Sequence, residues 1–372
     1  MTQTPTVAAI EERRPLTERL GRVRVASWAT AALLIVAVVA AVALQPNLLS
    51  PYGVASTFAT FLPLVLVAVA QAIVVIGGGL DLSAGAIVAL SSVVAVQVMQ
   101  GEAGSVPLGF LTAIGVGLAC GIVNGLVVSR LRLQPLIATF ATASVFSGLA
   151  LLVLPSPGGT VPAIITGTFR QAVGGVPVSV LLVVAVAAGW LVLRHLRIMR
   201  HIRATGGGPA AAFASLVPVA GAQLASYAIC GVICGLAGLA VLGNSGSGDP
   251  FIGGDLALGS VAAVVVGGIA LRGGIGSPIG AILRTFSAQA GREVMETLAP
   301  IAIAVSAVIP LRFFSFITVP SVKTYIWLRA GRELKRRIAD LWSSASNYRC
   351  GCLPLRLDHR LIYEGTVVGL TG

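Results

Sequence analysis

The chain has 372 residues, of which 56% are hydrophobic and only 10% are charged, with a mean hydropathy of +0.96 and a net charge of +12. Soluble domains carry roughly a quarter charged residues, so this composition excludes an ordinary cytosolic enzyme, and its high hydrophobicity excludes a disordered chain. The basic residues form short clusters that flank apolar stretches, which excludes a nucleic-acid-binding face and indicates a multi-pass membrane protein.

Apolar segments follow one another along most of the chain. A helix that crosses the hydrocarbon needs about 20 mostly apolar residues. The segments are continuous rather than alternating, which predicts an all-α membrane bundle and not a barrel. After an N-terminal segment, 1–24, we expect about ten spans, of which the last two are poorer matches: 27–45, 58–79, 83–99, 107–128, 133–154, 176–193, 221–242, 256–271, 276–296 and 297–318.

The distribution of charge predicts that both termini are cytoplasmic. Ten alternating spans place the Arg-rich N-terminus on the same side as Arg130 and Arg132, the run Arg194–Arg203, Arg272 and the basic tail from Lys323. Cytoplasmic loops of membrane proteins are enriched in Lys and Arg.

Two similar glycine-rich stretches suggest an internal repeat. IGGGLD at 76–81 and IGGDL at 252–256 each open an apolar span, and the expected topology puts them on opposite sides of the membrane. That is the parity of an inverted repeat, an arrangement that transporters use. Chance is the alternative, because the chain contains 45 glycines.

Asp81 is the only acidic residue between Glu18 and Glu102, and it lies in the stretch GGGLDLSAG at 77–85. One interpretation is a break between helices whose polar groups line a permeation path. The other is that Asp81 or Ser83 N-caps the third span, which the spacing alone favours. Both can hold, since irregular backbone at membrane depth is tolerated beside protein or a water-filled cavity.

Other chemistry finds little support in the sequence. A P-loop needs Lys directly after Gly, but Lys323 follows Val322 and Lys335 follows Leu334. A proton-coupled carrier would need acidic or His side chains inside the bundle, where Asp81 is the only candidate. Cys350, Cys352 and His359 match zinc-site spacings poorly. We therefore expect no enzyme activity and no cofactor, with any ATP hydrolysed by a separate chain.

The loop 194–220 is a second candidate functional element. Its Arg-rich start is followed by GGGP at 206–209 and then by small residues. A glycine-rich break before a short helix suits the docking of a cytoplasmic partner. A simple positive-inside loop is the alternative.

Three ordered stretches resemble the ribose/xylose/galactoside-type permeases of bacterial ABC importers. GGGLDLSAGA at 77–86 resembles that family's GGIDLSVGA motif, GIVNGLVVSRLRLQPLIAT at 121–139 its NGLLVARLRIPPFIAT segment, and VAAVVVGGIALRGGIGS at 261–277 its AAVVIGGTSLFGGRGS segment.

The resemblance implies an inner-membrane permease that dimerises and carries a monosaccharide by alternating access. Its partners would be two ABC ATPase subunits inside, a solute-binding protein outside and the surrounding lipid. The substrate path is expected at Gly78, Gly79, Asp81, Ser83 and Asn124. ATPase coupling is expected at Gly206, Gly207, Ala210, Ala211 and Ser215, within a region where Pro209 and the absence of an acidic pair depart from the family pattern.

The resemblance is limited to residues 25–283, taken as the permease domain. Residues 284–322 are expected to form poorly matching spans, because Arg284, Arg292 and Arg312 oppose insertion into the membrane. Residues 323–372 form a basic tail with no recognisable counterpart, and a change of reading frame near 284 is one explanation. The alternatives to a sugar permease are a branched-chain amino-acid ABC permease, a secondary carrier, or a permease made defective by this C-terminus.

Overall fold

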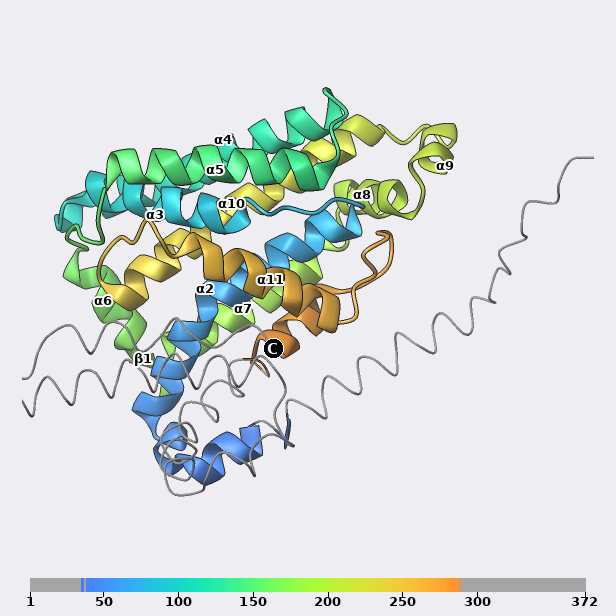
Figure 1. The fold of residues 1–372 in the computed structure, drawn as a ribbon. Helices are drawn as coiled ribbons and strands as arrows, with labels where there is room; N and C mark the ends of the chain where they lie inside the picture. Colours follow the sequence, from blue (N-terminus) through green and yellow to red (C-terminus); the bar gives the residue numbers. More distant parts are fainter. Residues whose placement is uncertain (1–34, 37, 287, 289–372) are drawn as a thin grey trace, which may run out of the picture. The chain divides into compact units, whose positions relative to one another are not determined.

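The fold is known from a computed structural model, which describes residues 35–36, 38–286 and 288 (Figure 1). These residues belong to the first of two compact units, residues 1–297. Their elements in chain order are η1 (Pro46–Leu49), α2 (Pro51–Ile76), α3 (Ala84–Met99), η2 (Ala103–Ser105), α4 (Val106–Ser129), α5 (Pro135–Val153), α6 (Ala163–Arg170), β1 (Ala172–Val173), β2 (Val176–Pro177), α7 (Val178–Leu193), α8 (Arg197–Gly207), α9 (Pro209–Ala214), α10 (Val219–Ser245) and α11 (Gly253–Val266). The prediction of an all-α helical bundle is confirmed, and the only sheet in the described part is the hairpin of β1 and β2.

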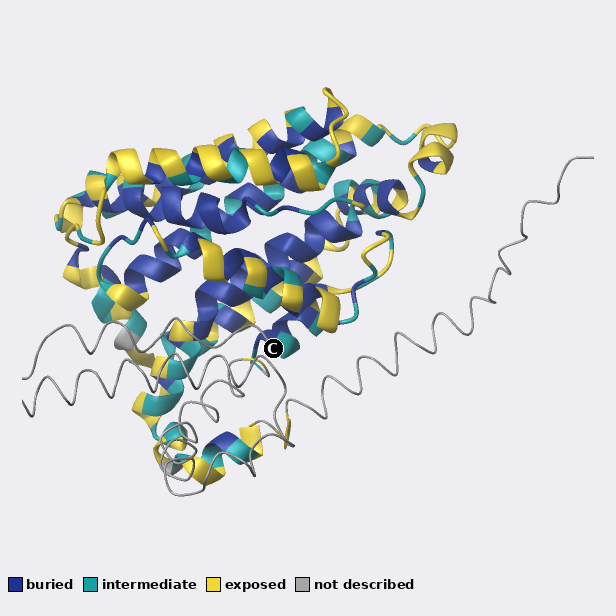
Figure 2. Ribbon diagram, in the orientation of Figure 1, coloured by how far each residue is buried: buried dark blue, intermediate teal, exposed yellow. Residues whose placement is uncertain are grey.

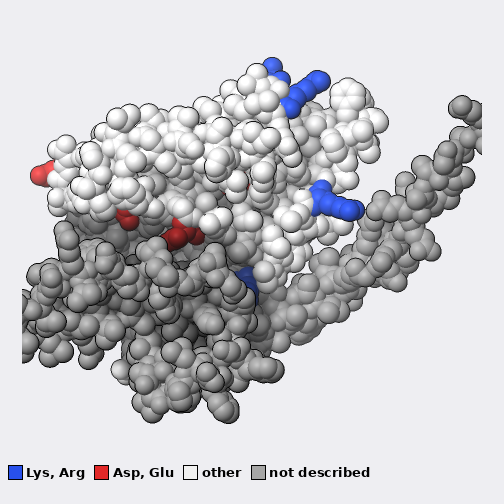
Figure 3. Space-filling model, viewed as in Figure 1, with Lys and Arg blue, Asp and Glu red and all other residues white. Residues whose placement is uncertain are grey.

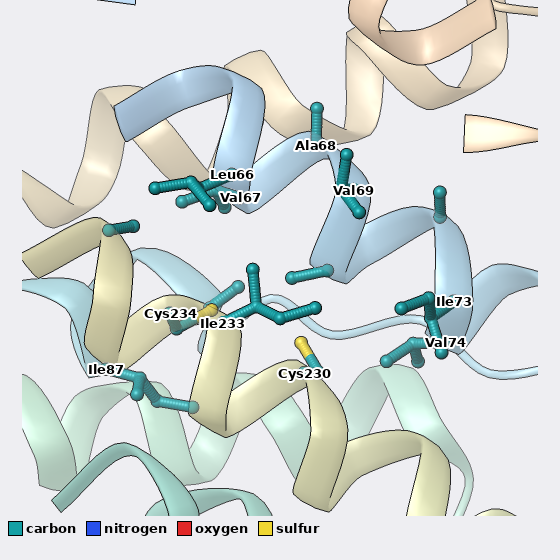
Figure 4. Close-up of a cluster of buried hydrophobic side chains, with 14 of the residues drawn as sticks. Leu66, Val67, Ala68, Val69, Ile73, Val74, Ile87, Cys230, Ile233 and Cys234 are labelled. Atoms are coloured by element: carbon teal, nitrogen blue, oxygen red, sulfur yellow. The ribbon is translucent and has the colours of Figure 1, made fainter. Parts of the chain in front are cut away.

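Helix α2 is the centre of the bundle. From Phe61 to Ile76 each of its residues is buried, and α10, α11, α7 and α3 pack around it (Figure 2). A helix that is apolar on all sides is stable only when protein or lipid surrounds it completely. Figure 4 shows side chains of α2, including Val69 and Ile73, facing Cys230 and Ile233 of α10. The tight packing of α2 fixes the position at which the chain leaves it, after Ile76.

Helices α4 and α10 cross backbone to backbone. A Cβ atom on Gly117 would collide with the carbonyl oxygen of Gly231, and one on Gly231 would collide with the carbonyl oxygen of Gly117. A Cβ on Gly121 would meet the carbonyl oxygen of Tyr227 in the same way. Small residues allow this close approach, which supplies much of the packing energy between helices in lipid. The glycines of these two spans therefore allow α4 and α10 to pack in direct backbone contact.

Helices α3 and α11 are shorter than their predicted spans. They have 16 and 14 residues, or about 21–24 Å at 1.5 Å per residue, against a hydrocarbon thickness of about 30 Å. Their N-terminal ends meet: a Cβ on Gly85 would collide with the carbonyl oxygen of Gly253, and one on Gly253 would lie 2.9 Å from the carbonyl oxygen of Gly85. Two interrupted helices thus start from one point inside the bundle and diverge (Figure 1).

The segments before these two helices contain the same kind of turn. Asp81 accepts a hydrogen bond from the backbone N–H of Ser83 at 2.8 Å, and Asp249 accepts one from that of Phe251 at 2.8 Å. Each aspartate lies four residues before one member of the Gly85–Gly253 contact. The structural counterpart of Asp81 is therefore Asp249.

Within the described part of the chain, four helical stretches are long and apolar enough to cross a membrane, or five if α7 and α8, which are bent by 78° to each other, count as one span. They are α2, Ala103–Ser129, α5 and α10. The predicted span 27–45 is described only in part. The expectations for 289–372 lie outside the described residues, so the total of about ten spans stays a prediction.

The surface of the described part fits a membrane environment. Large apolar side chains on α4, α5 and α7 are exposed, among them Leu111, Phe140 and Val184. On the face shown in Figure 3, most basic side chains lie toward the end of the bundle that carries α8 and α9, and the acidic ones lie toward the opposite end. Exposed apolar surface of this extent marks contact with lipid or another protein.

Candidate functional site

The segment between α2 and α3, residues 77–83, folds back along α2. The backbone reverses at Gly78, whose φ of +83° lies in the left-handed region that glycine adopts without strain. The side-chain amide of Gln71, oriented as its partners require, then holds Asp81: its nitrogen donates to the Asp81 carbonyl oxygen at 2.9 Å, and its oxygen accepts from the Asp81 N–H at 3.2 Å. Asp81 consequently lies beside the body of α2 rather than beyond its end.

The carboxylate of Asp81 is fully buried and is surrounded by neutral hydrogen-bond partners. Its Oδ1 accepts from the Ser83 N–H at 2.8 Å and from the Ser83 hydroxyl at 2.6 Å. Its Oδ2 accepts from the thiol of Cys230, on α10, at 3.6 Å. Buried polar groups are costly unless they are hydrogen-bonded. The aspartate therefore joins the segment before α3 to α10.

The hydrogen bonds continue from Ser83 across the bundle. The amide nitrogen of Asn124, on α4, donates to the Ser83 hydroxyl at 2.7 Å, and the hydroxyl of Thr142, on α5, donates to the Asn124 amide oxygen at 2.6 Å. Ser83 and Asn124 are both fully buried. The predicted site residues Asp81, Ser83 and Asn124 thus form one connected network, which satisfies polar groups from the segment before α3 and from α4, α5 and α10.

Leu80 and Leu82 tie the same segment to α5 and α10 through their backbones. The Thr139 hydroxyl accepts from the Leu82 N–H at 3.1 Å and lies 3.2 Å from the Leu80 carbonyl oxygen. The Tyr227 hydroxyl donates to that carbonyl oxygen at 3.4 Å. A Cβ on Gly79 would lie 2.6 Å from this hydroxyl, so a larger residue there would displace Tyr227 from this position.

Five side chains of this site were missed by sequence reasoning: Gln71, Thr139, Thr142, Tyr227 and Cys230. The signal that could have found the first four is a hydrogen-bonding side chain within a strongly apolar span, because such groups need a partner when buried. Cys230 offered no such signal, since a thiol packs well in an apolar core.

The capping interpretation needs a correction in detail. Ser83 occupies the N-cap position of α3, but its side chain makes no capping hydrogen bond to the helix. Its hydroxyl is instead engaged by Asp81 and Asn124. Asp81 accepts its backbone hydrogen bond from Ser83, so it caps the turn that precedes α3 and not the helix itself. Gly78, the remaining residue predicted for the path, lies apart from the network and contacts Gly206 of α8.

The predicted coupling residues occupy α8, α9 and the turn that follows. Gly206 and Gly207 are the last two residues of α8. Only Gly208 therefore separates α8 from α9, where a longer glycine-rich break was expected. Pro209 then begins α9, a position where proline is favoured because its missing N–H has no helical partner. The other three coupling residues, Ala210, Ala211 and Ser215, are exposed.

The surface around α9 is a hollow bordered by exposed apolar side chains. A cavity of about 710 Å³ lies between α9, the α4–α5 turn and the start of α10, and its lining includes Arg132, Phe213 and Gln223. Phe213 is 74% exposed and Leu216 is 93% exposed. Large apolar side chains that protrude beside a concave surface are typical of a protein interface.

No group of three or more His, Cys, Asp or Glu in the part of the chain that the structure describes could hold a metal ion. Cys350, Cys352 and His359 lie outside that part.

Comparison with known proteins shows the family. Residues 53–317 match the family described as "Branched-chain amino acid transport system / permease component". The match runs past Leu283, so similarity to the family does not stop where the resemblance of the three motifs did. No solved structure matches the chain.

The relatives are import permeases. The chain is 36% identical over 228 residues to the fructose import permease protein of Rhizobium meliloti, and this alignment covers 58% of this chain and 62% of the relative. It is 32% identical over 226 residues to the ribose import permease protein of Escherichia coli K12, covering 59% and 70%. It is 29% identical over 260 residues to the autoinducer 2 import system permease protein of Escherichia coli K12, covering 68% and 78%.

Proposed function

The chain belongs to the permease family of ABC importers and resembles its sugar-importing members, and from this premise we propose that it translocates a monosaccharide across the bacterial inner membrane by alternating access. The relatives named for fructose and ribose favour a sugar over the amino acids in the family's description. The chain spans under two thirds of the fructose permease, so activity, substrate and partners are all part of this proposal.

The observation that carries the proposal is the polar network around Asp81. It lies inside the bundle, beside the point where the interrupted helices α3 and α11 begin. Transporters form substrate paths at such interruptions, because irregular backbone offers polar groups that a continuous helix does not. We assign Gly78, Gly79, Asp81, Ser83 and Asn124 to the walls and gate of the path. With its polar groups paired to one another, the network forms a closed state of that gate.

We further propose that ABC ATPase subunits dock on α8 and α9. This segment combines exposed Phe213 and Leu216 with the basic end of the bundle, which the positive-inside rule assigns to the cytoplasm together with both termini. ATP is then used by the partner and not by this chain. The remaining partners are a solute-binding protein at the acidic end, a second permease copy and membrane lipid.

Two other functions, and a loss of function, make different predictions. A branched-chain amino-acid permease would share the fold and the ATPase but would be inhibited by leucine rather than by sugars. A secondary carrier would work without any ATPase and would respond to uncouplers instead of vanadate. A defective permease would reach the membrane and restore no uptake.

The test is an uptake assay on the complex purified from native membranes through a tag on this chain and reconstituted in liposomes with its solute-binding protein. We expect ATP-dependent uptake of labelled fructose or ribose, inhibited by vanadate and by an excess of unlabelled sugar but not by leucine. Inhibition by leucine alone would replace sugar by amino acid as the substrate. Uptake that is independent of ATP would overturn the ABC assignment.

A further inference from the structure

Three glycine-bearing segments meet where α8 touches the rest of the bundle. They are the end of α2 with Gly78, the last turn of α8 with Gly206, and the loop after α11 with Gly273 (Figure 1). The Gly274 N–H donates to the Ile76 carbonyl oxygen at 2.8 Å, so the loop is hydrogen-bonded to the end of α2. We call this three-way backbone contact the glycine junction.

The glycine junction has no room for side chains. A Cβ on Gly206 would collide with the carbonyl oxygen of Ile76 and lie 2.8 Å from the Gly274 nitrogen. A Cβ on Gly273 would lie 2.8 Å from the Cα of Gly78 and 2.7 Å from the carbonyl oxygen of Gly206. Close-packed backbone of this kind is stiff, because no flexible side chain lies between the segments to absorb a displacement.

A side chain extends the same contact toward α10. Ile202, one turn before Gly206 on α8, is fully buried, and its Cγ2 atom would lie 3.2 Å from a Cβ on Gly77. The same Gly77 position approaches Ser226 of α10. Helix α8 is therefore packed against the very residues at which the chain turns from α2 toward Asp81.

We infer that the glycine junction transmits movement of the α8–α9 segment to the segment 77–83, so that Gly78, Gly206 and Gly273 are positioning residues for transport. The inference rests on the proposed function, in which a partner ATPase moves α8 and α9. Displacement of Gly206 has to move Gly78, and the peptide that follows Gly78 leads within three residues to Asp81 and its network.

Gly207 provides a matched control for Gly206. Both are in the last turn of α8, but nothing lies within 4 Å of a Cβ on Gly207. Gly206→Ala therefore disturbs the glycine junction, whereas Gly207→Ala adds the same methyl group to open space. A second variant, Ile202→Ala, removes the Cγ2 atom and so loosens the contact instead of overfilling it, and it supplies the answer if Gly206→Ala does not accumulate in the membrane.

The first measurement is hydrogen–deuterium exchange of the purified permease, without an ATPase. We expect exchange at 77–83 to rise at least about threefold in Gly206→Ala and Ile202→Ala, with Gly207→Ala and the α4–α10 crossing unchanged. Equal exchange at 77–83 in Gly206→Ala and Gly207→Ala would overturn the inference. Because no ATPase is present, this outcome is independent of whether one binds.

The second measurement is the ratio of sugar transported to ATP hydrolysed by the reconstituted complex. We expect the two disturbing variants to lower this ratio about tenfold while ATP hydrolysis continues, and Gly115→Ala, which adds a methyl group to open space on α4 away from the docking segment, to keep it. A merely structural role would lower both activities in proportion to the amount of folded complex, and that result would contradict the inference. Failure of the wild-type permease to retain an ATPase would instead contradict the proposed function.

Discussion

Asp81→Ala is expected to lower uptake by at least about tenfold, because the segment before α3 loses the side chain that holds its hydrogen bonds together. The substitution leaves the buried Ser83 N–H without an acceptor, which costs about 1–3 kcal/mol of stability. It also removes a partner from the Ser83 hydroxyl and the Cys230 thiol. Thermal unfolding in detergent and uptake in a permease-deficient strain measure the two effects.

Two further variants distinguish the effect of losing the buried network from the effect of losing the local turn. Asp249→Ala removes the same backbone hydrogen bond, to Phe251 at an exposed site, and we expect it to cost under about 1 kcal/mol with uptake retained. Asp81→Asn keeps an oxygen that can accept from Ser83 and should retain most of the stability. If Asp81→Ala and Asp249→Ala behave alike, the network has no special role and the assignment of Asp81 is wrong.

Gly117→Ala is expected to lower the stability of the permease by about 1–3 kcal/mol or prevent its accumulation, because the added methyl group forces α4 and α10 apart. The obstacle is the backbone carbonyl of Gly231, which cannot rotate out of the way as a side chain can. The quantity to measure is the fraction of monodisperse protein after solubilisation, together with its unfolding temperature.

Gly115 serves as the control on the same helix. Nothing lies within 4 Å of a Cβ there, and the residue is exposed. Gly115→Ala should be neutral or stabilising by up to about 1 kcal/mol, because alanine favours the helix over glycine. A Gly117→Ala variant as stable as Gly115→Ala would show that the two helices do not cross at this point.

The sequence predicted the class of fold and the long helices well, because a continuous apolar run has few alternatives in a membrane. Helices α2, α4, α5 and α10 lie where spans were expected. Apolarity could not show that α3 and α11 begin inside the bundle. Their starting points depend on the contact between Gly85 and Gly253, which are far apart in the sequence.

The candidate site was predicted in part. Asp81 and Ser83 stood out as polar residues in an apolar stretch, and Asn124 came from the family resemblance. Gln71 lies on α2, and Thr139, which bonds the backbone of Leu82, is distant in sequence, so only the fold brings them to the segment 77–83. The role of Gly206 in the glycine junction could not be predicted from the sequence either, because the sequence does not show which atoms lie next to a glycine.

Affinity purification tests whether this chain is the membrane component of an ABC importer. The tagged chain would be extracted from its own membranes in mild detergent, and the proteins that accompany it identified by mass spectrometry. We expect a P-loop ATPase to accompany it, and to be lost when the exposed Phe213 of α9 is replaced in Phe213→Asp. A well-folded, abundant permease that retains no ATPase would show that the chain does not work as part of an ABC importer.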